Sequence, residues 1–153
     1  MLLSTIPELL ELLDLEEIEV GFFRGRNPVT VRQRTFGGQV LAQALTAAQR
    51  TVGDDRFVHS MHAYFLRPGR TDKPMIFAVE NMRDGRSFSS RRVLARQDGA
   101  VVLALTASFH IVEHGVEHQD PMPAAPPAED CPKMSTVFAE RSGAPAALFE
   151  QQW

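Results

Sequence analysis

The stretch Thr35-Phe-Gly-Gly-Gln-Val-Leu-Ala-Gln-Ala-Leu-Thr-Ala-Ala-Gln49 carries no formal charge and decides the fold. Its apolar side chains recur at helical spacing over most of the circumference; they are Val40, Leu41, Ala44, Leu45, Ala47 and Ala48. The spacing predicts a long helix that starts near Phe36 and is buried on most sides. The remaining stripe, Gln39, Gln43 and Thr46, lacks the Lys or Glu of a solvent face. It indicates contact with a partner surface or a polar cleft, with an uncharged exposed stripe as the alternative.

Beyond this helix the apolar pattern changes to alternation, which is typical of strands. A first strand ends at the Arg67-Pro68-Gly69 break, and further strands are predicted over 75–82, 88–96 and 101–109. Turn signals at Asp84-Gly85 and Asp98-Gly99 join the last three. One face of the first strand is expected to hold Phe57, His59, Met61, Ala63 and Phe65. In the last strand the residues expected to alternate toward the core are Val101, Leu103, Leu105, Ala107 and Phe109.

Two shorter elements precede the long helix. Ser4 or Thr5 can cap a helix that has Pro7 in its first turn and ends by Leu15, and a strand is predicted over 18–24. One buried helix and an antiparallel sheet satisfy this order of elements with short connections. The sequence therefore predicts an α+β fold, with the sheet wrapped around the long helix.

The composition changes after residue 120. Prolines crowd the next stretch, which reads as a linker: Pro121, Pro123, Pro126, Pro127 and Pro132. A weak helical pattern follows and is broken at Gly143-Ala-Pro145. We expect one domain over 1–120, and over 121–153 a linker leading toward a second domain.

The charge balance and the single cysteine limit the partners and the compartment. With 16 basic and 19 acidic residues the net charge is −3, so no positive field favours nucleic acid. Cys131 is the one cysteine, which excludes an internal disulfide and favours a reducing compartment. No leader pattern and no apolar run of about 20 residues is present, so we expect no membrane contact and a cytoplasmic protein.

Gly37 and Gly38 open the long helix. Glycine lets a ligand approach the backbone, and the first amides of a helix lie unpaired at its positive end. Such donors can stabilise an oxyanion that develops from a carbonyl. The alternative is that the glycines only let the preceding chain pass close to the helix.

Histidines and arginines supply the other candidates. His59, on the apolar face of its strand, is either a satisfied core group or a base facing a cleft, and His62 lies on the opposite face. His110, His114 and His118 are spaced by four, but Gly115 argues against a helix there, so no metal site is expected. Arg91 and Arg92 fall on opposite faces of one strand, so at most one can reach a given cleft.

Three segments together resemble a known family: Arg34-Thr-Phe-Gly-Gly-Gln-Val-Leu-Ala-Gln-Ala-Leu45, Val58-His-Ser-Met-His-Ala-Tyr-Phe-Leu-Arg-Pro-Gly69 and Arg83-Asp-Gly-Arg-Ser-Phe-Ser-Ser-Arg-Arg-Val93. They are similar to the amino-terminal repeat of bacterial type II acyl-CoA thioesterases, the TesB-like family. The resemblance covers about residues 9–132. It implies a hot dog fold, two copies of which form a double hot dog monomer, and hydrolysis of acyl-CoA to fatty acid and coenzyme A without a cofactor.

The resemblance also assigns the site. The residues expected to bind substrate are Gly37, Gly38, Gln39, His59, Ser87, Phe88, Arg91 and Arg92. The family's water-activating Asp, Gln and Thr or Ser lie in the second repeat, so no residue here inherits those roles. Three readings stay open: the amino-terminal half of a thioesterase, a single hot dog that dimerises and uses residues such as His59, or an acyl-CoA binding or interaction module without catalysis. The expected partner is a second hot dog domain or another copy of the chain.

Overall fold

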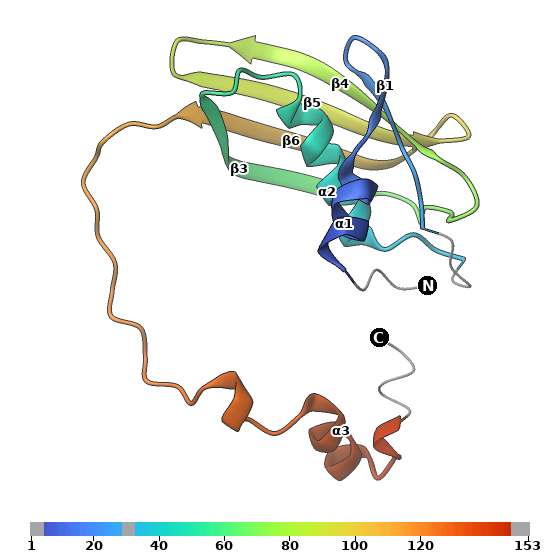
Figure 1. The fold of residues 1–153 in the computed structure, drawn as a ribbon, viewed down its shortest axis with the longest axis vertical. Helices are drawn as coiled ribbons and strands as arrows, with labels where there is room; N and C mark the ends of the chain where they lie inside the picture. The colour runs from blue at the N-terminus through green and yellow to red at the C-terminus, as the bar shows by residue number, and fades with distance from the viewer. Residues whose placement is uncertain (1–4, 29–32, 148–153) are drawn as a thin grey trace. The chain divides into compact units, whose positions relative to one another are not determined.

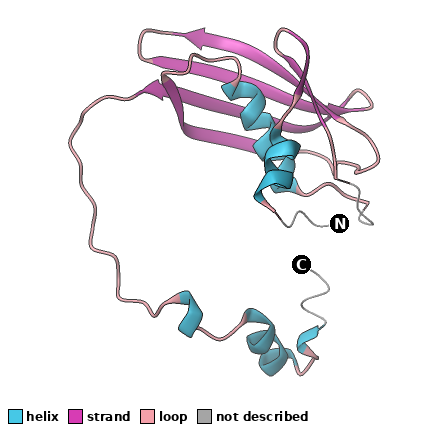
Figure 2. Cartoon of the chain, in the orientation of Figure 1, coloured by secondary structure: helices cyan, strands magenta, loops and turns pink. Residues whose placement is uncertain are grey.

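The structure, a computed structural model, describes residues 5–28 and 33–147. The chain divides into two units, Met1–His114 and Gly115–Trp153, each treated by itself below. The first unit holds helices α1 and α2 and strands β1 to β6, with both helices on one side of a single sheet (Figures 1 and 2). We call the side of the sheet away from α2 the outer face.

Helix α1 (Ile6–Leu13) begins and ends as the sequence predicts. Thr5 is its N-cap: the Thr5 amide donates to Glu8 Oε2 at 3.1 Å and the Glu8 amide to Thr5 Oγ1 at 3.4 Å. This reciprocal capping box satisfies two amides that the first turn of a helix leaves free. Ser4, the other predicted cap, lies outside the described residues.

The predicted strand over 18–24 is wrong as a single element. Two short strands take its place, β1 (Glu16–Glu19) and β2 (Phe22–Gly25), paired in antiparallel. Gly21, with φ of 77°, makes the turn between them. That left-handed conformation strains any residue with a Cβ, so the glycine fixes the reversal. The apolar pattern from Ile18 to Phe23 hid this turn.

Helix α2 (Gly37–Gln49) confirms the predicted long helix, but its polar stripe is not free for a partner. The Gln43 side chain is fully buried, and its amide donates to Leu12 O and Arg26 O, both at 3.0 Å. The stripe lacks charge because α1 and the chain after β2 cover it, and burying a charge there would be costly. The prediction of a partner surface on this stripe is therefore wrong.

The sheet has the strand order β1-β2-β4-β5-β6-β3 and is antiparallel throughout. Its four long strands are β3 (Arg56–Phe65), β4 (Met75–Asp84), β5 (Phe88–Gln97) and β6 (Ala100–Ile111). Asp98 (φ 49°) and Gly99 (φ 77°) form the tight turn predicted between the last two. The core between sheet and helix includes Phe23, Phe77, Val93, Leu105 and Phe109.

The alternation predicted for β6 holds from Leu103 to Phe109 but not at its start. There Val102, 5% exposed, is buried in place of Val101. The register shifts at this point, because Ala95 pairs with Leu103 while Arg96 pairs with Val101. The unpaired Val102 forms a bulge, which moves the preceding residues by one face.

The two edges of the sheet differ in length and charge. The β1 edge has four residues, three of them glutamates, and a bulge, features that discourage pairing with another strand. The β3 edge has ten residues and pairs, within the described residues, with β6 alone. Among its exposed side chains are Phe57, Met61 and Phe65. An edge of this length with apolar side chains is a template for a further strand.

The second unit has a short 3-10 helix, Ala128–Asp130, and helix α3 (Met134–Ser142). Gly143 (φ 69°) ends α3 in a left-handed cap, as its position before Ala144-Pro145 predicts. The segment from Gly115 to Pro127 has no helix or strand and is exposed. A domain boundary at residue 120 stays a prediction.

Candidate functional site

The N-terminus of α2 is open. Phe36 is the N-cap in an extended conformation, and no side chain caps the helix. The amides of Gln39 and Val40 donate to Phe36 O, whereas within the described residues those of Gly37 and Gly38 have no acceptor. Both amides lie at the positive end of the helix dipole. They can donate to a carbonyl oxygen or to the oxyanion that forms from it.

A pocket of about 350 Å³ lies at this end of the helix. Its lining is Thr35, Gly37, Val40, Phe65, Leu66, Arg67, Pro68, Gly69 and Val102. Most of these groups are apolar. The hydroxyl oxygen of Thr35 is buried and finds no partner among the described residues. An apolar wall beside free amides suits a ligand that has a hydrocarbon chain attached to a carbonyl group.

Gln39 points away from this pocket. Its side-chain amide donates to Asn27 Oδ1 at 2.7 Å and to Arg26 O at 3.3 Å. These bonds hold the chain after β2 against α2. In this structure Gln39 therefore supports the beginning of the helix, and its role in substrate binding stays a prediction.

His59 does not lie on the face that simple alternation predicts. In β3, Val58 pairs with Phe109 and Ser60 with Ser108, so His59 is an extra, unpaired residue. This bulge puts Met61, Ala63 and Phe65 on the helix side but returns His59 to the outer face. There His59 Nε2 lies 2.9 Å from Ser108 Oγ. Its ring centroid lies 5.7 Å from that of Phe88.

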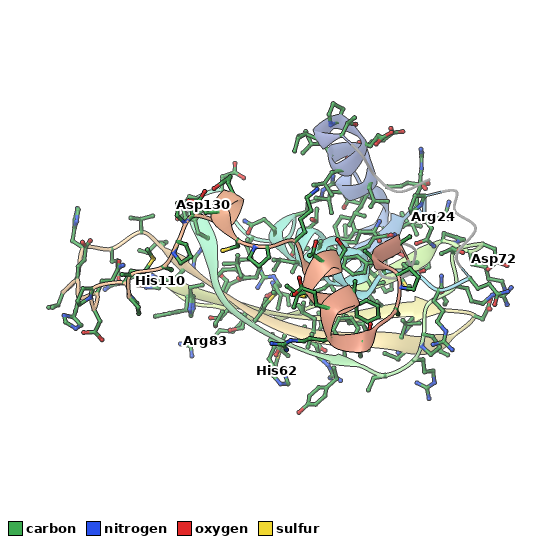
Figure 3. The ribbon with its side chains drawn as sticks, turned by 90° about the horizontal axis from the view of Figure 1, so that it is seen from below. Arg24, His62, Asp72, Arg83, His110 and Asp130 are labelled. Atoms are coloured by element: carbon green, nitrogen blue, oxygen red, sulfur yellow. The ribbon has the colours of Figure 1, made fainter. Side chains whose placement is uncertain are left out.

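The bulge also corrects the placement of His62, which was expected on the face opposite to His59. His62 pairs with Thr106 on the outer face, and its ring lies 4.6 Å from that of Tyr64. Figure 3 shows the sheet nearly edge-on, with His62 on the side of β3 away from α1 and α2. Both histidines therefore share the outer face.

The predicted site residues do not form one cluster. Phe65 lies six positions after His59 in β3, a distance of about 20 Å at the rise of a strand. Phe65 borders Gly37, on the helix side, whereas His59 lies on the outer face. His59 therefore cannot act as a base at the amides of Gly37 and Gly38. Its part in binding substrate elsewhere stays a prediction.

Ser87 and Phe88 lie at the same end of the sheet as His59. Ser87 Oγ is 3.4 Å from Glu113 Oε1. The Phe88 ring contacts that of His110, whose centroid is 4.2 Å away. Neither residue lines the pocket at α2, so the structure gives them no common site with Gly37.

Arg91 and Arg92 take opposite faces of β5, as predicted. Arg91, 1% exposed, faces the helix side, and its guanidinium donates to Thr51 just after α2 and to Asp84 Oδ1 at 2.8 Å. Two further bonds go to the carbonyls of Arg83 and Ser90. These internal partners use all five N–H groups of the guanidinium, and a role of Arg91 in substrate binding stays a prediction. Arg92 lies on the outer face, 3.7 Å from Glu80.

Asp84 is the titratable group that this network perturbs most clearly. Hydrogen bonds from Asn81, Ser89 and Arg91 favour its charged form and hold the pKa of the carboxyl at about 2, below its usual value of 3.8. The network joins the β4–β5 hairpin to the C-terminal end of α2. It lies at the end of the helix away from the pocket.

The pocket residues Thr35, Phe65 and Gly69 were not predicted as site residues. They come from two loops and a strand end that meet at the helix N-terminus, where the Thr35 amide donates to Gly69 O at 2.8 Å. The Arg67-Pro68-Gly69 break marked the end of a strand but carried no signal of this meeting. Within the described part of the chain, no three His, Cys, Asp or Glu side chains are grouped to hold a metal ion.

Comparison with known proteins connects this arrangement to a family. Residues 26–110 match the acyl-CoA thioesterase N-terminal domain. The chain belongs to this family. It is 46% identical over 125 residues to acyl-CoA thioesterase 2 of Haemophilus influenzae, covering 82% of this chain and 44% of that protein. With human acyl-coenzyme A thioesterase 8 the identity is 42% over 127 residues, covering 82% and 40%. The chain thus spans less than half the length of these relatives.

Solved structures agree with the expected fold. The acyl-CoA thioesterase II TesB2 of Mycobacterium marinum superposes with a TM-score of 0.72 at 48% identity, over 78% of this chain and 44% of that one. A protein with a hot dog fold from Alicyclobacillus acidocaldarius gives 0.69 at 24% identity, over 85% and 49%. The hot dog fold is confirmed. No helix in the described residues is long and apolar enough to cross a membrane.

Proposed function

We propose that this thioesterase-family chain acts as the amino-terminal half of a double hot dog enzyme that hydrolyses acyl-CoA to a fatty acid and coenzyme A. The observation that carries the proposal is the open N-terminus of α2, where within the described residues the amides of Gly37 and Gly38 have no acceptor and Gly37 lines an apolar pocket of about 350 Å³. The relatives named acyl-CoA thioesterases support the reaction class.

In the proposed reaction the thioester carbonyl accepts hydrogen bonds from these two amides. Attack by water forms a C–O bond and places negative charge on the carbonyl oxygen. The C–S bond then breaks, and coenzyme A leaves as the thiol after taking a proton. Hydrogen bonds from the two amides to the oxyanion lower the activation barrier. One donor of this kind raises the rate by about 10²–10³. The acyl chain lies along Val40, Phe65 and Val102.

The group that activates the water is expected to come from outside this chain. Among the residues that the structure describes, no carboxylate and no histidine lines the pocket. Thioester hydrolysis near neutral pH needs a group that takes the proton of the attacking water. We therefore expect the 153-residue chain to hydrolyse acyl-CoA at a negligible rate by itself.

The partner is proposed to be a second hot dog domain, or a second copy of the chain, docked on β3. This edge strand is ten residues long, and its exposed side chains include the apolar Phe57, Val58 and Met61. The helix side of β3 continues into the partly buried Leu41 and Leu45 of α2. A partner there brings a new surface beside Phe65 and the pocket. The site of action is proposed to be the cytoplasm, since the lone Cys131 needs no oxidising compartment.

A thiol-release assay tests the proposal. The chain is assayed with acyl-CoA alone and after joining to the second hot dog domain of a close relative. We expect turnover by the isolated chain to be negligible, and turnover of the joined protein to be lost when Gly38 is replaced by Val. Full activity of the isolated chain would refute the shared site, and its loss in His59→Ala would then support the single-domain enzyme.

A second candidate function is acyl-CoA binding without catalysis. The absence of an acid or base among the pocket residues favours it. Isothermal titration with a non-hydrolysable acyl-CoA thioether separates the two. Tight binding by the joined protein without turnover would select the binding module.

A further inference from the structure

Each of the two glycines that open α2 has a phenyl ring against it. A Cβ on Gly37 would lie 3.0 Å from the Phe65 ring, and a Cβ on Gly38 would lie 2.5 Å from the Phe36 ring. Contacts this short leave no room for a methyl group. The glycines therefore admit two aromatic rings to the helix backbone, Phe65 at Gly37 and Phe36 at Gly38.

The two rings differ in how they are held. Phe65 belongs to β3, where its backbone pairs with Leu103, and its ring lines the pocket. Phe36 precedes the helix, is 72% exposed, and does not line the pocket. The pairing of β3 holds the backbone of Phe65 beside the pocket, although its side chain is 57% exposed. Phe36 lies outside the helices and strands, and its more exposed ring can change rotamer on the ps–ns timescale.

We propose that Phe65 limits the length of the acyl group that the pocket accepts, and that Phe36 is a movable cover over the backbone at Gly38. This inference rests on the proposed function. The ring of Phe36 lies where a ligand would approach Gly38, so a thioester reaches the amides only when the ring turns away. The ring can then close on the bound acyl group and exclude water from that side.

The two residues make different contributions to specificity. Truncating Phe65 enlarges the pocket beside Val40 and Val102 and favours longer acyl groups. Truncating Phe36 leaves the pocket unchanged but removes the cover, so it affects all acyl lengths alike. A change of a few methylenes in a hydrophobic pocket alters discrimination by about 10-fold or more.

The test compares Phe65→Ala, Phe36→Ala and the control Phe22→Ala in the enzyme joined to its second domain. Phe22 is 44% exposed and lies on β2, which is not next to β3 in the sheet, and it does not line the pocket. The readout is kcat/KM for acyl-CoA of increasing chain length. For Phe65→Ala we expect the ratio of long to short substrates to rise about 10-fold. For Phe36→Ala we expect a uniform rise in KM, and for Phe22→Ala the wild-type profile.

The outcomes separate the inference from the function on which it rests. An inactive wild-type enzyme would refute the proposed function itself. An active wild type with the same chain-length profile in Phe65→Ala and Phe22→Ala would overturn the role of Phe65 alone. If Phe65→Ala fails to fold by circular dichroism, Phe65→Leu replaces it with the same expected direction. A Phe36→Ala enzyme that changes the profile, with KM unaltered, would overturn the movable cover.

Discussion

Replacing Arg91 with Met is expected to lower the free energy of unfolding by about 3 kcal/mol. Arg91 is buried and donates five hydrogen bonds, which hold Thr51 at the end of α2 to the β4–β5 hairpin. Removing one partner of a buried ion pair costs about 3–5 kcal/mol. The lower end applies, because the Asp84 side chain is 50% exposed and can be hydrated once Arg91 is gone.

Urea unfolding followed by circular dichroism measures this loss. With a slope of about 2 kcal/mol per M urea, the midpoint should fall by about 1.5 M. Arg92→Met is the matched control: it is the next residue, half exposed, and 3.7 Å from Glu80, so its loss should be below about 1 kcal/mol. Equal, small losses in both variants would refute a structural role for Arg91. A raised KM for acyl-CoA with unchanged stability would support its role as a substrate ligand.

Three further predictions concern pH, packing and the sheet edge. Because the pKa of Asp84 is lowered to about 2 by Asn81, Ser89 and Arg91, its ionised form stabilises the fold above about pH 4 and that stability is lost as the pH falls toward 2. Asp84→Asn should therefore cost on the order of 1 kcal/mol at pH 6, reduced by solvent screening, and less at pH 2.5; a constant difference in urea unfolding would contradict this. Gly25→Ala should cost about 1–3 kcal/mol, since its Cβ would lie 2.8 Å from the buried Phe77 ring; an unchanged melting temperature would show that the core yields there. Met61→Lys should weaken association through β3 without unfolding the chain, and light scattering that shows the same oligomer as wild type would place the interface elsewhere.

The sequence predicted the regular parts of the fold because they follow the periods of a helix or a strand. The uncharged run of α2 and the Asp98-Gly99 turn carry local signals and were found. The bulge at His59 carries none, since it depends on how β3 meets Ser108 across the sheet. One inserted residue moved His59 to the outer face and so removed it from the neighbourhood of Gly37.

The burial of Gln43 was missed for a related reason. A polar stripe on a helix looks the same in sequence whether solvent, a partner or the chain itself covers it. Here Leu12 O and Arg26 O accept its amide protons, and Leu12 lies before the β1–β2 hairpin whereas Arg26 lies directly after it. The pocket behind Gly37 likewise depends on the loop at Gly69, distant in sequence from the helix. Contacts between segments that are distant in the sequence produce no helical or strand periodicity, so the sequence pattern does not indicate them.

The two ends of α2 are built for different tasks, and this explains how the chain can accept a partner without losing its fold. At the C-terminal end the buried Arg91 donates to Thr51 and to Asp84, and Arg50 donates to Asp14 at 2.7 Å, so hydrogen bonds from arginines hold the end of the helix to the sheet and to the segment after α1. At the N-terminal end the contacts around the pocket are aromatic rings on glycine, and the Thr35 hydroxyl has no partner among the described residues. Repacking an aromatic ring against new apolar neighbours costs less free energy than separating a buried charged group from its partners. A domain that docks on β3 can therefore contact Phe65 and displace the Phe36 ring from Gly38 while the opposite end keeps α2 in place.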